Sequence, residues 1–250
     1  STNNRIMVPF YVYYSMFGFQ RIGDLAWAAG DMQARGFLLG GTSGRTTLNG
    51  EGLQHEDGHS HILANTIPNC VSYDPTFAHE VAVIMHDGLK RMVERQENVF
   101  YYITLLNENY AMPGLLPGTE EQIIKGMYLC KPGADGDKRV QLLGSGTILR
   151  ESLEAQTLLA ADWGVQADVW SCPSFNELTR EGQDAERWNL LHPLETPRVP
   201  FVTRQLGSRS GPVVASTDYM KAYAEQIRPF VPKGRSYRVL GTDGFGRSDF

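Results

Sequence analysis

The feature that most constrains the fold of this chain is the alternation of short apolar runs with segments of helical periodicity. Residues 7–14 (MVPFYVYY) form a β-branched and aromatic run typical of a buried strand, and residues 36–41 form a second apolar run. Between the two runs, apolar side chains recur at helical spacing, at Ile22, Leu25, Ala26 and Ala29. This alternation predicts a parallel sheet whose strands are joined by crossover helices.

Residues 71–106 repeat the pattern most clearly. Residues 71–73 predict a strand, Asp74 and Pro75 predict the N-cap and first turn of a helix, and residues 99–106 predict the next strand. The predicted helix carries apolar residues at helical spacing, namely Phe77, Val81, Ile84, Met85, Leu89 and Met92. One face of this helix is therefore expected to be buried.

A stretch rich in glycine and proline, residues 107–137, separates this region from a second one. Beyond it we expect strands at residues 140–143, 165–171, 213–216 and 237–240, and helices at residues 148–163 and 218–228. The predicted fold class is therefore α/β, with a parallel sheet flanked by helices in each part. We expect a first domain in residues 1–115, a linker in residues 116–137 and a smaller α/β domain in residues 138–250.

Composition and charge exclude several kinds of partner. The net charge is −5 and charges of both signs are interspersed, so there is no basic stripe to attract nucleic acid. No apolar run approaches the roughly 20 residues of a membrane helix, and no signal pattern is present, so we expect a cytosolic protein without a membrane partner. Cys70, Cys130 and Cys172 are widely spaced in apolar contexts and are expected to be buried, reduced thiols.

The loop at residues 42–58, together with the residues that follow it, is the strongest candidate for a functional site. Histidines and acids are concentrated in residues 50–61 (GEGLQHEDGHSH), namely His55, His59, His61, Glu51, Glu56 and Asp57. These are possible metal ligands, but the glycine-bearing loop lacks the paired histidines on a helix of a zinc hydrolase. Acid–base or substrate-binding chemistry fits better, because histidine titrates near neutral pH and adjacent carboxylates fix its tautomer.

Two further motifs have ordinary structural explanations. Residues 144–146 (GSG) follow a strand and open a helix, but they lack the third glycine and the acidic partner of a dinucleotide site, so we expect a tight packing turn. Residues 188–200 (WNLLHPLETPRVP) contain three prolines and are expected to be a rigid surface connection. A role at a subunit interface is the alternative for this second tract.

Longer strings connect the chain to a known family. Residues 50–61, the residues around them, and the strings LNENYAMPG, GQDAERWNLLHPLETPRVP, ASTDYMKAYAEQIRPFVP and YRVLGTDGFGRSD resemble the homodimeric bacterial type of pyruvate dehydrogenase decarboxylating component. This family depends on thiamine diphosphate and belongs with the transketolase-like enzymes. The resemblance implies the carboxyl-terminal part of a pyrimidine-binding domain, followed by a truncated transketolase C-terminal-like domain.

The resemblance also implies roles for particular residues. His55 matches the family histidine that faces the substrate, so it is expected to bind the pyruvate carboxylate or the covalent adduct, with Glu51 as a polar neighbour. Tyr14 and Phe17 match the aromatics that line the aminopyrimidine of the cofactor, and Tyr14 is also expected to take part in catalysis. His61 matches a cofactor-side or substrate-side histidine of transketolases. No metal ligand is expected among these residues.

The resemblance also implies that part of the cofactor site lies outside this sequence. The ligands of magnesium and of the diphosphate, and a glutamate that acts on the aminopyrimidine, belong in this family to sequence before Ser1. We therefore expect the chain to be an excised piece that is inactive and binds the cofactor weakly by itself. The implied partners are pyruvate, a second subunit in a homodimer, and the dihydrolipoyl acetyltransferase component with its lipoyl domain.

Two other functions stay open. Ketol transfer of the transketolase type would require basic residues for sugar phosphates near the loop, and the nearby candidates are Arg21 and Arg45. A non-catalytic dimerisation or scaffold module is the alternative for the isolated chain.

Overall fold

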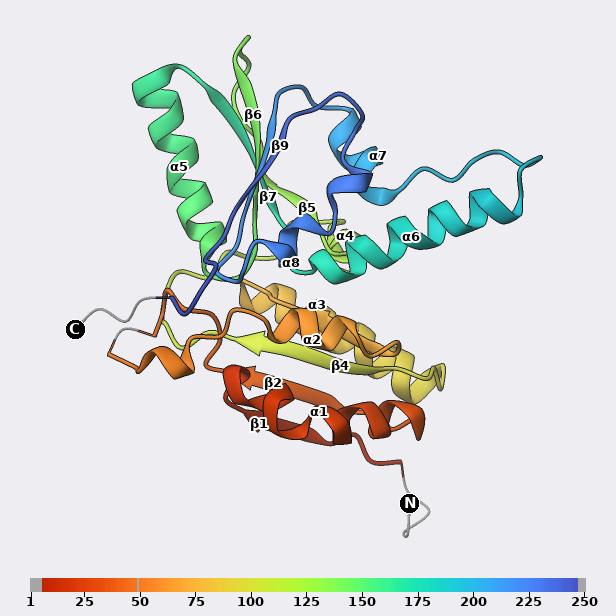
Figure 1. Cartoon of the computed structure of the whole chain (residues 1–250). Helices are drawn as coiled ribbons and strands as arrows, with labels where there is room; N and C mark the ends of the chain where they lie inside the picture. The colour runs from red at the N-terminus through yellow and green to blue at the C-terminus, as the bar shows by residue number, and fades with distance from the viewer. Residues whose placement is uncertain (1–5, 49, 247–250) are drawn as a thin grey trace.

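Two sheets, each covered by helices, form the two halves of the molecule (Figure 1). The computed structural model describes residues 6–48 and 50–246. The first sheet is parallel, with the strand order β1-β2-β4-β3. Its strands are β1 (Phe10–Tyr13), β2 (Phe37–Gly41), β3 (Cys70–Tyr73) and β4 (Phe100–Leu105).

Helices cover both faces of the first sheet. Helices α1 (Ser15–Asp31) and α2 (Ser60–Asn65) pack on one face, and α3 (Ala78–Leu89) packs on the other and continues as the π-helix η2 (Lys90–Glu94). Side chains from α3, η2 and the strands form a buried cluster that includes Phe37, Val71, Ile84, Met92 and Ile103. Burying side chains of this size stabilises a fold by about 1.5–3 kcal/mol each. The predicted parallel sheet with crossover helices is confirmed.

The second sheet has the order β5-β7-β6-β8-β9 and is parallel except for the edge strand β5. Its strands are β5 (Tyr128–Lys131), β6 (Arg139–Gly144), β7 (Gln166–Ser171), β8 (Val213–Ser216) and β9 (Tyr237–Leu240). Helix α5 (Ile148–Trp163) packs on one face. The other face is covered by α6 (Phe175–Leu191), α7 (Phe201–Gly207), α8 (Ala222–Glu225) and the 3₁₀ turn η3 (Arg228–Phe230).

The turn at residues 144–146 is the packing turn expected from the sequence. A side chain at Gly144 would come within 2.8 Å of the Leu149 backbone, and Gly146 has φ +52, which favours glycine. Gly164 ends α5 in the left-handed conformation with φ 62, as its place after the apolar periodicity predicts.

Buried polar bonds join the two halves. The Glu80 carboxylate of α3 accepts hydrogen bonds from the Ser171 hydroxyl at 2.5 Å and the Tyr128 hydroxyl at 2.8 Å, both from the second sheet. On α6, the Asn176 amide donates to the His61 carbonyl at 2.8 Å and to the Ser72 hydroxyl. Such bonds are short-range and directional, so they specify how the halves are oriented.

Helix α3 begins later than the sequence predicted. The expected N-cap, Asp74, lies before the helix, and the Glu80 carboxylate instead accepts from the backbone N–H of Thr76 at 2.6 Å and of Phe77 at 3.1 Å. Asp74 is occupied elsewhere, because it accepts a hydrogen bond from the Thr104 hydroxyl on β4.

The expected helix at residues 218–228 is wrong in extent. Only α8 and the turn η3 form there. Asp218 and Met220 bond to the loop after β2 rather than along a helix, since the Met220 N–H donates to the Gly58 carbonyl at 3.0 Å. Contacts with a distant segment thus override the local periodicity.

Strand β1 is exposed rather than buried as predicted. It lies at the edge of the first sheet, and half or more of Phe10, Tyr11 and Val12 is accessible to solvent. The apolar run identified a strand correctly, but its burial depends on what covers the sheet edge, and no described residue pairs beyond β1.

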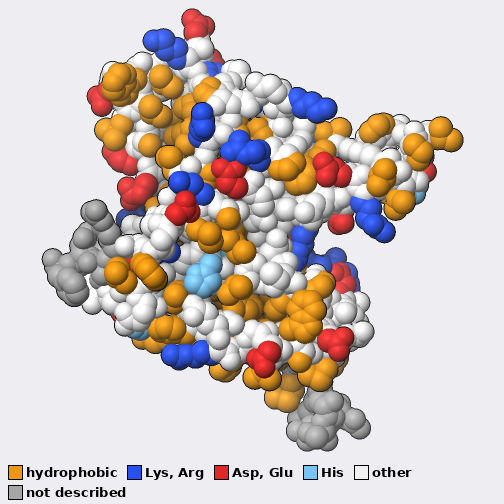
Figure 2. Space-filling model, in the orientation of Figure 1, with side chains coloured by type: hydrophobic (Ala, Val, Ile, Leu, Met, Phe, Trp, Pro, Cys, Tyr) orange, Lys and Arg blue, Asp and Glu red, His pale blue; other side chains and the backbone are white. Residues whose placement is uncertain are grey.

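Helix α6 was missed, and with residues 192–200 it forms an arm that projects from the second half (Figure 1). The arm is internally braced: the Trp188 ring stacks on His192 at 3.5 Å, and the Arg198 guanidinium lies 3.5 Å from the same ring. Hydrophobic side chains gather on the arm (Figure 2), where Leu194 is fully exposed. The surface connection predicted at residues 188–200 is shorter in the structure, because residues 188–191 belong to α6 and the connection begins at residue 192.

Other predictions have mixed outcomes. Part of the expected linker, residues 116–137, is ordered as α4 (Glu120–Lys125) and as β5 of the second sheet, and the proposed division into domains stays a prediction. Cys70 and Cys172 are buried free thiols, as expected, and Cys130 is half-buried. Among the described residues, no helix is both long and apolar enough to cross a membrane.

Candidate active site

The fold brings residues 50–61 next to the start of α1. The loop leaves the carboxyl end of β2, and α1 begins directly after the carboxyl end of β1, which is hydrogen-bonded to β2 in parallel. The carboxyl ends of parallel strands meet at one edge of a sheet, where α/β proteins commonly bind ligands. A 3₁₀ turn, η1 (Leu53–His55), then directs His55 back toward α1.

His55 lies between two aromatic rings. Its imidazole is 5.3 Å from the Tyr14 ring and 4.9 Å from the Phe17 ring, both edge-to-face. The Glu51 carboxylate approaches His55 Nδ1 to 3.5 Å. The structure therefore brings together four of the predicted site residues, which come from two segments separated by most of α1 and by β2.

This cluster, the His55 site, is open to solvent. The side chains of His55 and Glu51 are 23% and 42% exposed, and the Arg21 guanidinium lies over the Phe17 ring, 4.6 Å from its centre. A cavity of about 190 Å³ adjoins the site and is lined by Tyr14, Phe17 and Arg21 among others. An accessible imidazole beside aromatic walls can donate a hydrogen bond to a small anion.

His61 lies apart from the His55 site, although the sequence placed both in one cluster. It is fully buried between the sheets, and its ring stacks on Tyr223 at 5.0 Å and contacts Tyr219 edge-to-face at 4.9 Å. Burial lowers the pKa of His61 to about 3, because the interior cannot hydrate an imidazolium ion. No part of His61 reaches solvent in this structure, and its predicted contact with a cofactor stays a prediction.

A chain of hydrogen bonds continues from His61. Its Nε2 lies 3.1 Å from the Thr104 hydroxyl, which donates to the Asp74 carboxylate at 2.7 Å, and the Tyr219 hydroxyl approaches Asp74 at 3.3 Å. Burial raises the pKa of the Asp74 carboxyl to about 7, although the bonds from Thr104 and Tyr219 oppose that shift. Near neutral pH this carboxyl is therefore only partly ionised.

Sequence reasoning missed these partners of His61. Asp74 directly follows β3 and Thr104 lies near the end of β4, so their positions at the carboxyl ends of neighbouring parallel strands could have indicated that they meet. Tyr219 gave no such signal, because it lies in the segment that follows β8 of the other sheet.

The remaining charged residues of the loop have structural partners. Asp57 accepts from the N–H groups of His59 at 3.0 Å and Ser60 at 2.9 Å, which satisfies two backbone donors at the start of α2. Arg45 is nearly buried, and its guanidinium donates to the Gly244 carbonyl at 2.8 Å and to the Thr242 carbonyl. Within the described residues, no group of three or more His, Cys, Asp or Glu side chains could hold a metal ion.

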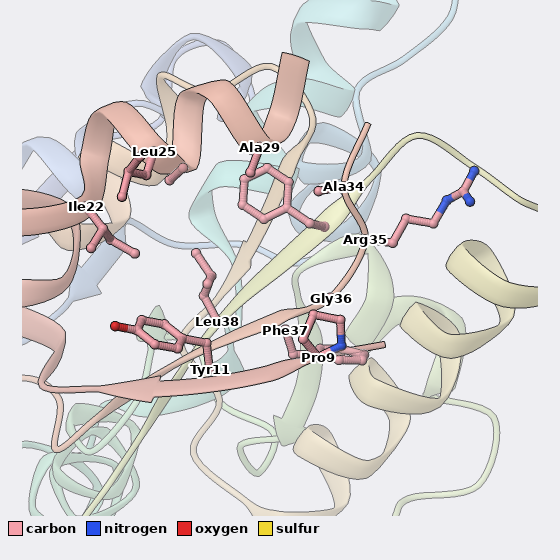
Figure 3. Close-up of a pocket in the computed structure, with 12 residues that line it drawn as sticks. Pro9, Tyr11, Ile22, Leu25, Ala29, Ala34, Arg35, Gly36, Phe37 and Leu38 are labelled. Atoms are coloured by element: carbon pink, nitrogen blue, oxygen red, sulfur yellow. The ribbon is translucent and has the colours of Figure 1, made fainter. Parts of the chain in front are cut away.

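A larger cavity, about 260 Å³, lies between α1 and the first sheet (Figure 3). Its walls are mostly apolar side chains such as Ile22, Leu25 and Phe37. Arg35 points away from it and donates to the Glu97 carbonyl at 3.0 Å. Because its lining is mostly apolar and Arg35 points away from it, this cavity is a poorer candidate for a reaction than the His55 site.

Comparison with known families agrees with this arrangement. Residues 126–250, half of the chain, match the family described as the transketolase-like TK C-terminal domain, so the chain belongs to the transketolase-like family. Residues 1–113 match the family described as the pyruvate dehydrogenase E1 component middle domain. The two matched segments follow one another and together cover nearly the whole chain.

Within that class, its whole length is similar to pyruvate dehydrogenase E1 components. It is 68% identical over 250 residues to that of Escherichia coli and 65% identical to that of Pseudomonas aeruginosa. The match covers 100% of this chain but only 28% of each relative, so the chain spans about a quarter of their length.

Solved transketolases share the fold. The transketolase of Campylobacter jejuni matches with a TM-score of 0.66 at 18% identity, over 98% of this chain and 32% of that one. The enzyme of Leishmania mexicana matches with a TM-score of 0.67 at 16% identity, over 97% of this chain and 31% of that one. Identities this low establish only the fold, which confirms the predicted α/β class.

Proposed function

We propose that the chain is part of a pyruvate dehydrogenase E1 component that decarboxylates pyruvate and reductively acetylates the lipoyl group of an acetyltransferase component. The observation that carries the proposal is the His55 site, where His55, Glu51, Tyr14 and Phe17 meet at the carboxyl edge of the first sheet. The 68% identity to the E1 component of Escherichia coli supports the same activity.

Thiamine diphosphate is the cofactor that this function requires, and it supplies the carbon nucleophile and electron sink of the decarboxylation. The aromatic rings of Tyr14 and Phe17 beside an open cavity fit the ring portion of this cofactor. The described residues include no cluster that fits a metal ion, so we propose that the magnesium and diphosphate ligands lie outside this chain.

His55 is the group that we propose binds pyruvate. When both ring nitrogens carry protons, the imidazole can donate a hydrogen bond from Nε2 to the substrate carboxylate while Nδ1–H faces the Glu51 carboxylate. Tyr14 and Phe17 hold the ring in place and exclude water from one side of the reacting groups. These residues thus bind, orient and desolvate the substrate.

Transketolase chemistry is the less favoured alternative. Of the two basic residues expected to bind sugar phosphates, Arg45 is nearly buried and bonded to backbone carbonyls. Arg21 remains accessible but lies over the Phe17 ring. A phosphate site built on two arginines is therefore not available at this loop.

The assembly belongs to the proposal. We propose a homodimer in the cytoplasm, within a multienzyme complex that includes the acetyltransferase component and its lipoyl domain. Exposed leucines on the arm of residues 192–200 and the end of α6, namely Leu190, Leu191 and Leu194, support a subunit interface, since surface leucines cluster where proteins associate.

The test uses the full-length polypeptide that contains this chain. With thiamine diphosphate and magnesium, it should release carbon dioxide from pyruvate and show no ketol transfer from xylulose 5-phosphate. The opposite preference would overturn the proposal. Calorimetric titration of the 250-residue chain alone should show no micromolar binding of the cofactor, and tight binding would contradict the placement of its ligands outside this chain.

A further inference from the structure

Asp218, in the second half, holds the beginning of the loop that carries the His55 site. It follows β8, is 5% exposed, and its carboxylate accepts from the backbone N–H of Arg45 at 2.6 Å and of Thr46 at 2.9 Å. The Thr46 hydroxyl donates to the other carboxylate oxygen at 2.6 Å. Hydrogen bonds to an ionised acceptor are stronger than neutral ones, so this carboxylate is a firm attachment.

Arg45 makes the reciprocal contact. Its guanidinium donates to the carbonyls of Thr242 and Gly244, which follow β9 in the second half. The same guanidinium packs against the loop, since a side chain at Gly58 would come within 2.2 Å of it. Arg45 is therefore enclosed between the loop and the segment after β9.

The loop is held at both ends by the second half. Asp218 binds its start at Thr46, and the Met220 N–H binds the Gly58 carbonyl near its end at 3.0 Å. Gly44 shows how closely the loop fits, because it has φ +75 and a side chain there would come within 2.4 Å of the Asp218 carboxylate. His55 lies between the two attachments.

We propose that Asp218 and Arg45 form a latch by which the second domain positions His55 against Tyr14 and Phe17. Asp218 is then a positioning residue that touches no substrate. This inference rests on the proposed function only where it is tested by turnover of pyruvate. It assigns the second domain a task at a site made entirely of residues from the first.

The physical reason is the sensitivity of catalysis to geometry. A displacement of about 1 Å in a reacting group lowers turnover by about a hundredfold, and short loops without regular structure move by that amount when an attachment is lost. Among the described residues, the Thr46 N–H and the Gly58 carbonyl have no alternative buried hydrogen-bond partner. Removing the carboxylate should therefore loosen the loop and leave the rest of the fold in place.

The experiment compares Asp218→Asn with Asp243→Asn in the full-length holoenzyme. Asp243 is the control, because its carboxylate also accepts from a nearby backbone, the Lys221 N–H at 3.0 Å, but it is exposed and its hydrogen-bond partner is Lys221 rather than the loop. Asp218→Asn should lower kcat/KM for pyruvate by about tenfold to a hundredfold. Asp243→Asn should leave it unchanged within about twofold.

Amide hydrogen exchange gives a readout that does not depend on activity. In Asp218→Asn, exchange should accelerate in residues 45–58 and stay the same in the strands of both sheets. Unchanged exchange in residues 45–58 together with unchanged kcat/KM would overturn the latch. A wild-type protein inactive with pyruvate would overturn the proposed function, and the exchange result would still decide the latch.

A second pair of variants covers the case in which Asp218→Asn does not fold. Thr46→Val removes the hydroxyl that binds Asp218, and Thr46→Ser retains it. Rescue by serine is expected: Thr46→Val should lower kcat/KM about threefold to tenfold, and Thr46→Ser should behave like the wild type. Equal values for the two variants would contradict the role of this bond.

Discussion

His55 and His61 lie six positions apart in the sequence, yet they occupy opposite kinds of environment. His55 is half-exposed between two aromatic rings and faces a carboxylate at 3.5 Å. His61 is fully buried among tyrosine rings and bonds to the Thr104 hydroxyl. The difference teaches that a cluster of histidines can combine one residue suited to chemistry with another that organises the interface between two sheets.

The physical basis of the difference is solvation. The partly exposed ring of His55 is accessible to a substrate, whereas burial makes the charged form of His61 unfavourable and lowers its pKa to about 3. His61 is therefore expected to contribute to stability and His55 to turnover. Four predictions test this contrast, from the largest expected effect to the smallest.

Replacing His61 should affect stability most. His61→Ala removes a buried ring, its contacts with Tyr219 and Tyr223, and the partner of Thr104, so the free energy of unfolding should fall by about 3 kcal/mol. Urea unfolding of the chain measures this change. The control is His59→Ala, in the same loop but half-exposed, which should cost less than about 1 kcal/mol. Equal losses for the two variants would contradict the contrast.

Replacing His55 should affect turnover and spare the fold. In the full-length enzyme, His55→Ala should lower kcat/KM for pyruvate by about a hundredfold, because the hydrogen-bond donor to the carboxylate is lost. The affinity for thiamine diphosphate and the unfolding midpoint should change little, and His59→Ala again serves as the control. Undiminished turnover would show that His55 is not the substrate-binding residue.

The pH dependence of stability should report the low pKa of His61 once Asp74 is replaced by a residue that does not titrate. The folded pKa of His61 is lowered from 6.5 to about 3, so below 6.5 the unfolded chain takes up a proton that the folded chain cannot, and stability falls as the pH falls. The pKa of Asp74 is raised from 3.8 to about 7, so its contribution falls as the pH rises through that range. In the wild type these two dependences oppose each other.

Asp74→Asn removes the second dependence. The variant should lose about 2 kcal/mol of stability between about pH 7 and about pH 5, whereas the wild type should change by less than about 1 kcal/mol. Urea unfolding at the two pH values gives both numbers. A variant whose stability does not depend on pH would show that His61 titrates normally and is not confined as described.

The smallest effect is expected at Glu51. Its carboxylate lies 3.5 Å from His55 Nδ1 and is partly exposed, so the pair is screened by solvent. Glu51→Gln should therefore lower kcat/KM for pyruvate only about threefold, and high salt should reduce the difference from the wild type. A loss as large as that of His55→Ala would mean that Glu51 itself contacts the reacting groups.

Much of the fold could be predicted because its signals are local. The strands at residues 213–216 and 237–240 form as expected. Gly164 ends α5 because the backbone there is in the left-handed conformation, which glycine adopts without strain. Helix α6 was missed because its composition is polar and its buried face becomes apparent only against the second sheet. The helix expected at residues 218–228 failed because Asp218 and Met220 bond to a loop far away in sequence.

The candidate site divides in the same way. The sequence by itself determined which chemical groups are present at residues 50–61 and, through apolar periodicity, that a parallel sheet would support them. Only the tertiary structure decided that His55 reaches Tyr14 and Phe17, that His61 is withdrawn into the interface, and that Asp218 binds the loop. The reason is that solvation and hydrogen-bond partners depend on which distant segments come into contact. The apolar periodicity of the sequence predicts helices and strands, but it does not predict those contacts.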